Sequence, residues 1–240
     1  EKKYGELEIE RAKLERWPNP YPEGAILNYI PALEVPPRYR GRDLLWGERY
    51  HLLRKPFWEV PGKDIRKEVS KVMVTFGGDD LRNLTPRVVN LLLNRLEGVQ
   101  IHVVVGGGFR SKDLLEEISE RHPQRVFLHH NLTAEGMRDL MLEADIAVSA
   151  GGQTLFELAR VGTPTAAVCV ADNQVNNLRG FTKLGFLNNF LRWDEPNLED
   201  LLWEEIEKLL PKEEREKKNS LGRSLIDGKG AKRVAEYFLP

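Results

Sequence analysis

Short apolar runs alternate with amphipathic segments from Lys71 onward, and this alternation constrains the fold more than any other feature. Five or six mostly apolar residues in a row predict a buried strand, and apolar residues at helical spacing predict a helix. The predicted strands are 71–76, 101–105, 126–129, 145–149 and 165–170. The predicted helices are 85–96, 112–121, 135–143, 153–161 and 174–184. This order predicts right-handed βαβ units, and hence an α/β fold with a Rossmann-like, doubly wound parallel sheet.

The C-terminal part of the chain is predicted to be helical. Residues 197–210 carry apolar side chains at helical spacing, and 231–239 predict a last short helix. Between them, the mixed charge run 212–218 predicts a solvated helix face. The one cysteine, Cys169, lies in an apolar run and is predicted to be a buried, small hydrophobic side chain.

Composition excludes several classes of partner. The formal net charge is −1, so nothing favours binding to a nucleic-acid backbone. No apolar run approaches the roughly 20 residues that a membrane span needs, and no signal peptide is expected at the start. With a single cysteine and no possible internal disulfide, a cytoplasmic location is expected.

Residues 1–63 differ from the rest of the chain. They hold eight of the 14 prolines, together with Trp17, Trp46 and Trp58, and one strand candidate at 25–30. Proline removes backbone donors and limits regular pairing. We therefore expect 1–63 to be the end of an N-terminal domain plus a linker, followed by a domain at 64–240. The tryptophans suggest an interface for a further domain. Because the chain begins with Glu1, we expect it to be processed or cut from a longer protein.

Glycines and polar residues follow all five predicted strands. In an open parallel sheet, ligands bind at the carboxyl ends of the strands. The alternative is that loops are polar anyway, which explains one or two of these ends better than all five. The residues at these ends, in strand order, are Gly77, Gly78 and Asp79; Gly106–Gly108; His129, His130 and Asn131; Gly151–Thr154; and Asp172, Asn173 and Gln174.

The segment 144–164 carries the strongest local signal. A buried strand ends in Gly151 and Gly152, and a helix begins at Gln153. Without side chains at the glycines, a phosphate can approach the N–H groups and the positive dipole end of the helix. Glu157 follows Gln153 by one turn on the same face, where a carboxylate could accept from two ribose hydroxyls. The pattern suits a nucleoside diphosphate, and the alternative is an ordinary strand–turn–helix with an exposed glutamate.

Other chemistries fit less well. The triple glycine 106–108 lacks the third glycine of a dinucleotide fingerprint, since position 111 is Ser. His129 and His130 point to opposite faces of a strand and cannot chelate one metal as a local pair. We expect neither a metal nor a cofactor. Asp79 and Asp80 form an acidic pair next to glycines. A carboxylate of this pair could act as a base or bind a sugar hydroxyl, and a role in turn formation is as reasonable.

Several motifs together resemble one family. They are 74–80 (VTFGGDD), 144–157 (ADIAVSAGGQTLFE), 171–174 (ADNQ), 226–234 (IDGKGAKRV), and the linker pieces 39–41, 44–45 and 50–54. In these motifs the chain looks like the nucleotide-binding half of the UDP-sugar hydrolases of the pseudaminic-acid pathway, a group that includes spore-coat polysaccharide proteins. The resemblance covers about residues 25–238. A more distant similarity to the lipid-II-forming N-acetylglucosamine transferase implies the C-terminal half of a glycosyltransferase-B fold.

The resemblance also implies roles for individual residues, with UDP or a UDP-sugar as ligand. The glycine loop would meet the diphosphate, Glu157 the ribose, and the loop after the third strand the uracil through its backbone. The first loop would flank the phosphates, and the fifth would contact the sugar or phosphate. The implied site residues are Gly77, Gly78, Asp79, Asn131, Leu132, Gly151, Gly152, Gln153, Thr154, Glu157, Asn173 and Gln174.

The chain departs from this family at its start. Family members begin with another Rossmann domain, in which a histidine on a glycine-rich loop is proposed to activate water. Residues 1–63 hold no such segment, so we expect the general base to come from a missing domain or partner chain. Three hypotheses follow: a UDP-sugar hydrolase without its catalytic half, a related transferase or nucleotide-sugar 2-epimerase subunit, and a non-catalytic nucleotide-binding or assembly module.

Overall fold

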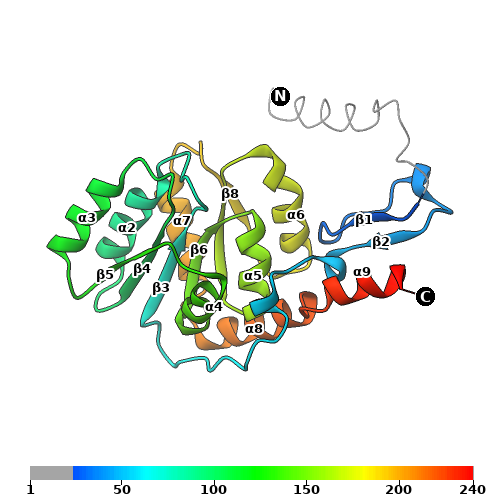
Figure 1. Cartoon of the computed structure of the whole chain (residues 1–240). Coiled ribbons are helices and arrows are strands. Elements are labelled where there is room, and N and C mark those ends of the chain that lie inside the picture. The colour runs from blue at the N-terminus through cyan, green and yellow to red at the C-terminus, as the bar shows by residue number, and fades with distance from the viewer. Residues whose placement is uncertain (1–23, 240) are drawn as a thin grey trace.

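The computed structural model describes residues 24–239 and is built on a six-stranded sheet (Figure 1). The strand order is β5-β4-β3-β6-β7-β8, and every neighbouring pair is parallel. The strands are β3 (Lys71–Thr75), β4 (Gln100–Val105), β5 (Val126–His130), β6 (Ile146–Ala150), β7 (Thr165–Cys169) and β8 (Phe190–Arg192). The predicted doubly wound α/β fold is confirmed. Strand β8 was not predicted, because three residues carry too little pattern.

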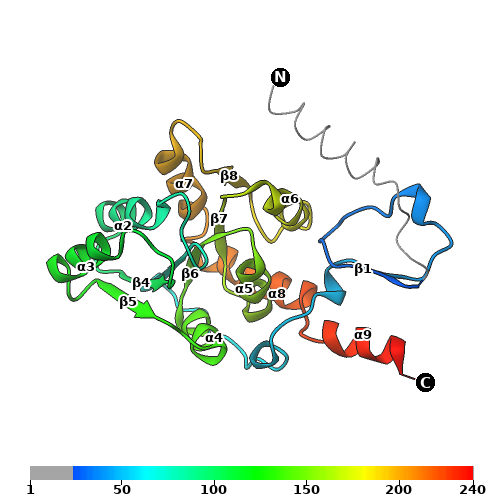
Figure 2. The same ribbon diagram turned by 45° about the horizontal axis from the view of Figure 1, so that its top comes forward.

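Helices cover both faces of this sheet (Figures 1 and 2). On one face lie α2 (Leu84–Arg95), α3 (Lys112–Arg121) and α7 (Leu198–Glu207), whose apolar residues share a core with alternate strand residues. On the other lie α4 (Ala134–Glu143), α5 (Gln153–Val161) and α6 (Val175–Lys183). The predicted helices are confirmed to within one or two residues at most ends.

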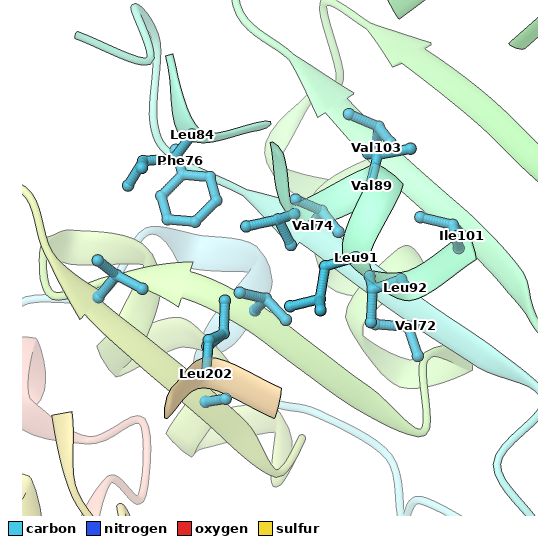
Figure 3. Packing of buried hydrophobic residues seen from close by; sticks show 14 of the residues in the cluster. Val72, Val74, Phe76, Leu84, Val89, Leu91, Leu92, Ile101, Val103 and Leu202 are labelled. Carbon is cyan, nitrogen blue, oxygen red and sulfur yellow. The ribbon is translucent and has the colours of Figure 1, made fainter. Parts of the chain in front are cut away.

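The core explains why the strands read as continuous apolar runs. A parallel sheet covered on both faces has no solvent side, so residues of both parities are buried. Val72 and Val74 pack against α2 and α7, whereas Met73 between them belongs to the opposite cluster. Figure 3 shows Leu91 and Leu92 of α2 packed against the valines, with Leu202 of α7 beside them.

Residues 24–63 form a small second sheet. Strands β1 (Ile26–Asn28) and β2 (Leu44–Trp46) pair in parallel, and the predicted strand at 25–30 corresponds to β1. This part also holds three 3-10 helices: η1 (Pro37–Tyr39), η2 (Glu48–Tyr50) and η3 (Lys55–Phe57). A proline lies in the first turn of both η1 and η3. In Figures 1 and 2 this part lies beside α9 (Gly230–Phe238), at the opposite end of the molecule from α3. Trp17 lies outside the described residues.

The predicted solvated face of 212–218 is only partly correct. These residues open α8 (Lys212–Leu225), which packs along α5. Lys217 faces solvent, but Arg215 and Lys218 are buried. The Lys218 amine donates to the Gly185 carbonyl oxygen (2.7 Å), and the Arg215 guanidinium donates to that of Lys67 (3.0 Å). Backbone carbonyl oxygens, and for Lys218 also the Glu214 carboxylate (3.3 Å), hold these buried charges, which charge composition alone does not reveal.

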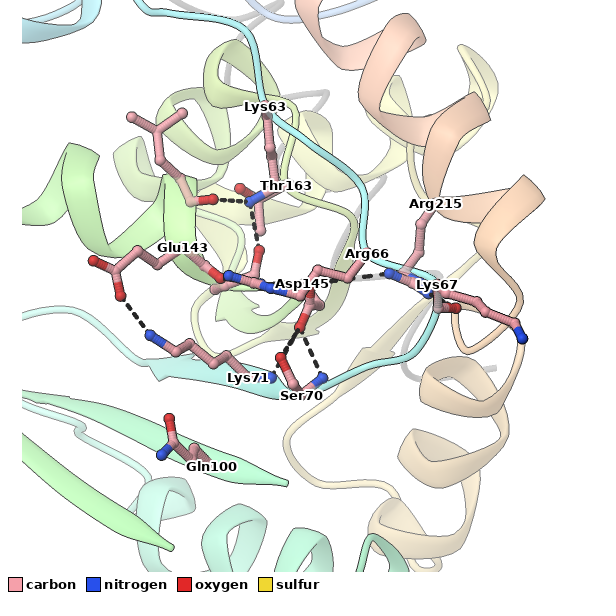
Figure 4. Close-up of polar contacts among 12 residues, drawn as sticks. Lys63, Arg66, Lys67, Ser70, Lys71, Gln100, Glu143, Asp145, Thr163 and Arg215 are labelled. Carbon is pink, nitrogen blue, oxygen red and sulfur yellow. Dashed lines mark hydrogen bonds and ion pairs between the residues drawn. The ribbon is translucent and has the colours of Figure 1, made fainter. Parts of the chain in front are cut away.

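A polar cluster ties the amino ends of the strands together (Figure 4). Asp145, just before β6, accepts from the backbone N–H groups of Ser70 (2.8 Å) and Lys71 (2.9 Å) and from Arg66 (2.8 Å). Lys63 donates to the Met141 and Leu142 carbonyl oxygens at the end of α4, and burial lowers the pKa of its amine to about 7. The cluster is structural, because ligands of such sheets bind at the opposite, carboxyl edge.

Within residues 24–239, no helix combines the length and apolar character that crossing a membrane requires.

Candidate functional site

The site is defined by the point where the strand order reverses. Strands β3 and β6 are neighbours at the centre of the sheet, but α2 leaves β3 on one face and α5 leaves β6 on the other. Such a topological switch opens a crevice outside the carboxyl ends of the two strands. The loops that begin at Gly77 and Gly151 border this crevice.

Two loops beside the crevice are interlocked through glycines. The Gly108 N–H donates to the Gly78 carbonyl oxygen (3.0 Å). A Cβ at Gly106 would lie 2.1 Å from that oxygen, and one at Gly108 would lie 2.0 Å from Asp79 Oδ1. The triple glycine therefore has a packing role, because the loops after β3 and β4 touch backbone to backbone. Gly77, Gly78 and Asp79 remain exposed at the rim, as a ligand-contacting loop requires.

The two neighbouring aspartates have different environments. Asp80 is buried, and its carboxylate accepts from the N–H groups of Leu84 (2.9 Å) and Thr85 (2.8 Å) at the start of α2. This is a helix cap, so the turn-forming role considered for the acidic pair belongs to Asp80. Asp79 is exposed and available to a ligand.

The start of α5 is open at one glycine and packed at the other. A Cβ at Gly151 would lie 2.5 Å from Leu178 Cγ of α6, so this glycine is needed for helix packing. At Gly152, only the Gln174 Nε2 atom lies within 4 Å of such a Cβ, at 3.8 Å. No side chain caps the helix at Gly152, and the N–H groups of a first turn have no intrahelical partner. Gln153 is exposed and Thr154 half-buried beside this opening.

Two amides hold the glycine loop in place. Gln174 Oε1 accepts from the N–H groups of Gly151 (3.2 Å) and Val170 (3.1 Å), which ties the loop to the end of β7. Asn177 Nδ2 donates to the Gly151 carbonyl oxygen (3.1 Å). Gln174 therefore positions the glycine loop, and its amide nitrogen also lies beside Gly152. Asn173, the preceding residue, is exposed. Sequence reasoning missed Asn177, because a single Asn inside a predicted helix carries no signal.

Glu157 is buried, which corrects the alternative reading of an exposed glutamate. Its side chain is 1% exposed, and Arg54 from the linker donates from Nε to Oε1 (2.7 Å) and from Nη2 to Oε2 (2.9 Å). Burial raises the pKa of Glu157, and the Arg54 guanidinium opposes that shift. The carboxylate therefore lies one turn below the open start of α5, but beneath an arginine.

His51, from the linker before η3, adds an imidazole beside α5. The ring stacks on Phe156 of α5 with centroids 3.7 Å apart and meets the edge of Tyr29 at 4.5 Å. Within the described residues, neither ring nitrogen makes a hydrogen bond of acceptable geometry. The Gln153 side chain nevertheless lies close enough to influence the pKa of the ring. Burial lowers the pKa of His51 to about 4, partly offset by Gln153, so the ring is neutral near pH 7. Only the structure places this residue beside α5.

The loop after β5 lies farthest from α5. Asn131 is exposed with a left-handed φ of 51°, Leu132 is half-buried, and the Thr133 hydroxyl caps α4 by accepting from the Gly136 N–H (3.2 Å). In the sheet, β5 stands three strands from β6, which is roughly 14 Å at the usual strand spacing.

The histidines of the sheet form a pair that sequence reasoning did not foresee. His102 Nδ1 of β4 lies 2.9 Å from His129 Nε2 of β5. Burial, with a smaller contribution from His129, lowers the pKa of His102 to about 4. Burial also lowers the pKa of His129. In the part of the chain that the structure describes, no group of three or more His, Cys, Asp or Glu side chains is placed to hold a metal ion.

The sheet order and its switch-point crevice define a Rossmann-like domain of the glycosyltransferase-B type. MurG of Acinetobacter baumannii has this fold, with a TM-score of 0.59, 16% identity, and coverage of 95% of this chain and 62% of that one. A TarM mutant of Staphylococcus aureus, solved in complex with UDP among other ligands, gives a TM-score of 0.54 at 13% identity, covering 84% of this chain and 40% of that one. Residues 72–236 match the glycosyltransferase family 28 C-terminal domain, and the chain belongs to that family.

Three curated relatives match between about half and three quarters of this chain. An uncharacterized protein of Methanocaldococcus jannaschii is 29% identical over 51% of this chain. The pseudaminic acid cytidylyltransferase and UDP-2,4-diacetamido-2,4,6-trideoxy-beta-L-altropyranose hydrolase of Helicobacter pylori is 28% identical over 51%. The spore coat polysaccharide biosynthesis protein SpsG of Bacillus subtilis is 23% identical over 77%. The matches span only 26%, 21% and 55% of these relatives' own lengths, respectively.

Proposed function

We propose that this chain is the UDP-binding half of a UDP-sugar hydrolase in the synthesis of a surface polysaccharide. The observation that carries the proposal is the open, uncapped start of α5 at Gly152, located at the switch point of a glycosyltransferase-type sheet. Family membership supports nucleotide-sugar chemistry. The names of the H. pylori and B. subtilis relatives support a sugar of the pseudaminic-acid kind and a polysaccharide pathway.

In this proposal the helix start stabilises the leaving group. Attack of water on the sugar carbon releases UDP, whose diphosphate gains negative charge as the glycosidic bond breaks. N–H groups and the helix dipole at Gly152, Gln153 and Thr154 would neutralise that charge without a metal ion. Gly77, Gly78 and Asp79 would flank the phosphates from the β3 loop, and Asn173 and Gln174 would approach them from the β7 loop.

The remaining proposed contacts are to the ribose and the uracil of the nucleotide. Glu157 would accept from the ribose hydroxyls. Asn131 and Leu132 would face the uracil through backbone groups, because β5 stands roughly 14 Å from β6 in the sheet. Backbone contacts leave no side-chain signature, so the preference for uridine in this proposal rests on the similarity to the UDP-sugar hydrolase of H. pylori.

The catalytic base would come from another domain. Strands β1 and β2 form a two-stranded parallel sheet, which is rarely self-sufficient. Leu27 and Tyr29 of this part are exposed, as are Tyr237 and Phe238 of α9 beside it. We infer that residues 1–63 are the end of an N-terminal domain whose remainder, in the same protein or a partner chain, completes this sheet and supplies the base.

A transferase or 2-epimerase subunit is the second candidate, because the fold match to MurG covers 95% of this chain. It would use the same half-site and differ in what the other half does at the sugar ring. Turnover of a UDP-sugar by the completed protein in ¹⁸O-water separates these activities. A hydrolase places solvent oxygen in the released products, a transferase requires an added acceptor, and an epimerase returns a UDP-sugar with an inverted C2.

The first test is calorimetric titration of this chain with UDP, with ADP as the base control. We expect UDP to bind more tightly than ADP, and a Gly152→Val variant to lose UDP binding because its side chain fills the approach to the helix start. An Asn176→Ala variant, at an exposed position of α6, is the matched control and should bind as the unmodified chain does. A folded chain that binds neither nucleotide, or binds both equally, contradicts a uridine-nucleotide half-site.

A further inference from the structure

Arg54 covers the buried carboxylate of Glu157, one turn below the start of α5. The contact is bidentate, with distances of 2.7 Å and 2.9 Å. The exposed fractions of the two side chains differ sharply, at 46% for Arg54 and 1% for Glu157. The cation of the pair therefore faces solvent and the anion faces the protein, so any ligand that reaches Glu157 meets Arg54 as well.

The pair leaves hydrogen-bonding capacity unused on both sides. An ionised carboxylate offers about four acceptor positions, and a guanidinium about five N–H donors. Arg54 and Glu157 use two of each on one another, and no further hydrogen bond to either side chain is recorded within residues 24–239. Acceptors for a diol and donors for an anion thus lie within one side-chain pair.

The linker that carries Arg54 is fixed on α5 at both ends. His51 stacks on Phe156, and the Arg160 guanidinium donates to the carbonyl oxygens of Phe57 and Trp58, both at 2.9 Å. Arg54 is therefore held against the helix by contacts other than its own ion pair. Glu157 follows Gln153 by four residues, about 6 Å along the helix, which is comparable to the span from a ribose to its phosphates.

We propose that Arg54 is a binding and positioning residue of the nucleotide site, one that aligns Glu157 for the ribose diol and offers its outer N–H groups to the diphosphate. This inference rests on the proposed function and adds to it a residue outside the glycine loops. Planar guanidinium groups suit both partners, since their paired N–H groups match carboxylate and phosphate oxygens.

Arg54 also controls the charge of Glu157. Burial raises the pKa of this carboxyl, and Arg54 is the group that opposes the shift. Removal of Arg54 raises that pKa further, so that Glu157 is protonated at a pH where it is ionised in the unmodified chain. A protonated carboxyl loses acceptor capacity for the diol. The loss of nucleotide affinity is then largest at low pH and partly recovers as the pH rises.

The experiment titrates UDP and 2′-deoxy-UDP into the 240-residue chain across the neutral pH range, with four variants. Arg54→Gln is expected to lose about tenfold or more of the UDP affinity, the value of one charge-assisted hydrogen bond or more, with the larger loss at the acid end of the range. Arg54→Lys keeps the charge and is expected to keep the pH profile of the unmodified chain. Glu157→Gln is expected to bind UDP and 2′-deoxy-UDP equally at every pH.

Arg160→Gln is the matched structural control, since Arg160 secures the same linker one turn further along α5. It should preserve the pH profile and the preference for UDP over 2′-deoxy-UDP. The inference is overturned if Arg54→Gln keeps the unmodified profile, if it binds UDP more tightly, or if Arg160→Gln shifts the profile equally. Failure of the unmodified chain to bind UDP overturns the proposed function itself and this inference with it, so the two failures are distinguishable.

Discussion

At the residue scale, adjacent and chemically identical positions have different roles. Gly151 makes room for Leu178, whereas Gly152 leaves an opening. Asp80 caps a helix, whereas Asp79 is exposed. The sequence predicted the same phosphate-binding role for both glycines, and it left the roles of the acidic pair open, with only Asp79 among the predicted site residues. Packing partners from α6 and α2 decide the difference, and a linear pattern does not contain them.

The two glycines give a direct comparison. Gly151→Ala places a methyl group 2.5 Å from Leu178 Cγ, and overpacking of this kind costs about 1–3 kcal/mol of unfolding free energy. Gly152→Ala meets only the Gln174 amide nitrogen at 3.8 Å and should leave stability nearly unchanged. Urea denaturation of both variants measures the difference. Equal losses of stability would mean that Leu178 does not constrain the loop.

The buried histidines predict a pH dependence of stability. The pKa values of His51 and His102 are both lowered from 6.5 to about 4, so the folded state prefers their neutral forms. The unfolded chain takes up protons first, and stability is complete above about pH 6.5 and falls as the pH drops toward 4. Each group contributes up to about 3 kcal/mol to this loss.

His51→Phe tests one half of this effect. Phenylalanine preserves the stack on Phe156 and removes two ring nitrogens that lack partners in the described structure. Urea unfolding between about pH 4.5 and 7.5 should show a shallower acid loss than in the unmodified chain, with similar stability near neutral pH. If the loss of stability with falling pH is unchanged in His51→Phe, groups other than His51 are responsible for it.

At the scale of elements, the sequence predicted most of the sheet and its helices, because β3, β4, β6 and β7 are buried on both faces and read as apolar runs. Sequence-based prediction failed where tertiary contacts, and not the local sequence pattern, determine the structure. Strand β8 has three residues, and the buried cations of α8 look like any surface charges. The Arg54–Glu157 pair joins residues 103 positions apart. No local rule connects a linker arginine to a helix carboxylate.

Helix α8 supplies a matched test. Lys218 is buried and donates to the Gly185 carbonyl oxygen, whereas its neighbour Lys217 is exposed. Lys218→Ala removes a buried partner and its packing, and should cost about 1–3 kcal/mol of unfolding free energy. Lys217→Ala should change it by less than about 0.5 kcal/mol. Thermal unfolding of the two variants decides the point, and a costly Lys217→Ala would show that charge rather than burial matters.

At the scale of the whole molecule, residues 24–63 are packed against the large sheet domain. Pro31 touches α6, His51 and Tyr29 cover Phe156, and the Arg223 guanidinium donates to the carbonyl oxygen of Pro61 (2.9 Å). These contacts put the linker, with Arg54, against the rim of the proposed nucleotide site.

Gly180 of α6 allows a test of how tightly residues 24–63 pack on the sheet domain. A Cβ at this position would lie 2.0 Å from the Pro31 carbonyl oxygen, so Gly180→Ala should push the N-terminal segment away from α6 despite its better helix propensity. Limited proteolysis should then cleave residues 24–63 faster, while the sheet domain stays resistant. Asn176→Ala on the same helix is exposed and serves as the control. Identical cleavage rates in both variants would contradict a tight attachment.

The single thiol gives the molecule a built-in reporter. Cys169 is 1% exposed at the end of β7, where burial raises its pKa and its Sγ lies 3.3 Å from the Ala171 carbonyl oxygen. A thiol reagent can reach it only when the structure around β7 opens, and no second cysteine contributes to the signal. The labelling rate of the unmodified chain therefore reads out opening of the site-bearing strands. Because β7 leads directly into the loop of Gln174, a bound nucleotide should slow that rate.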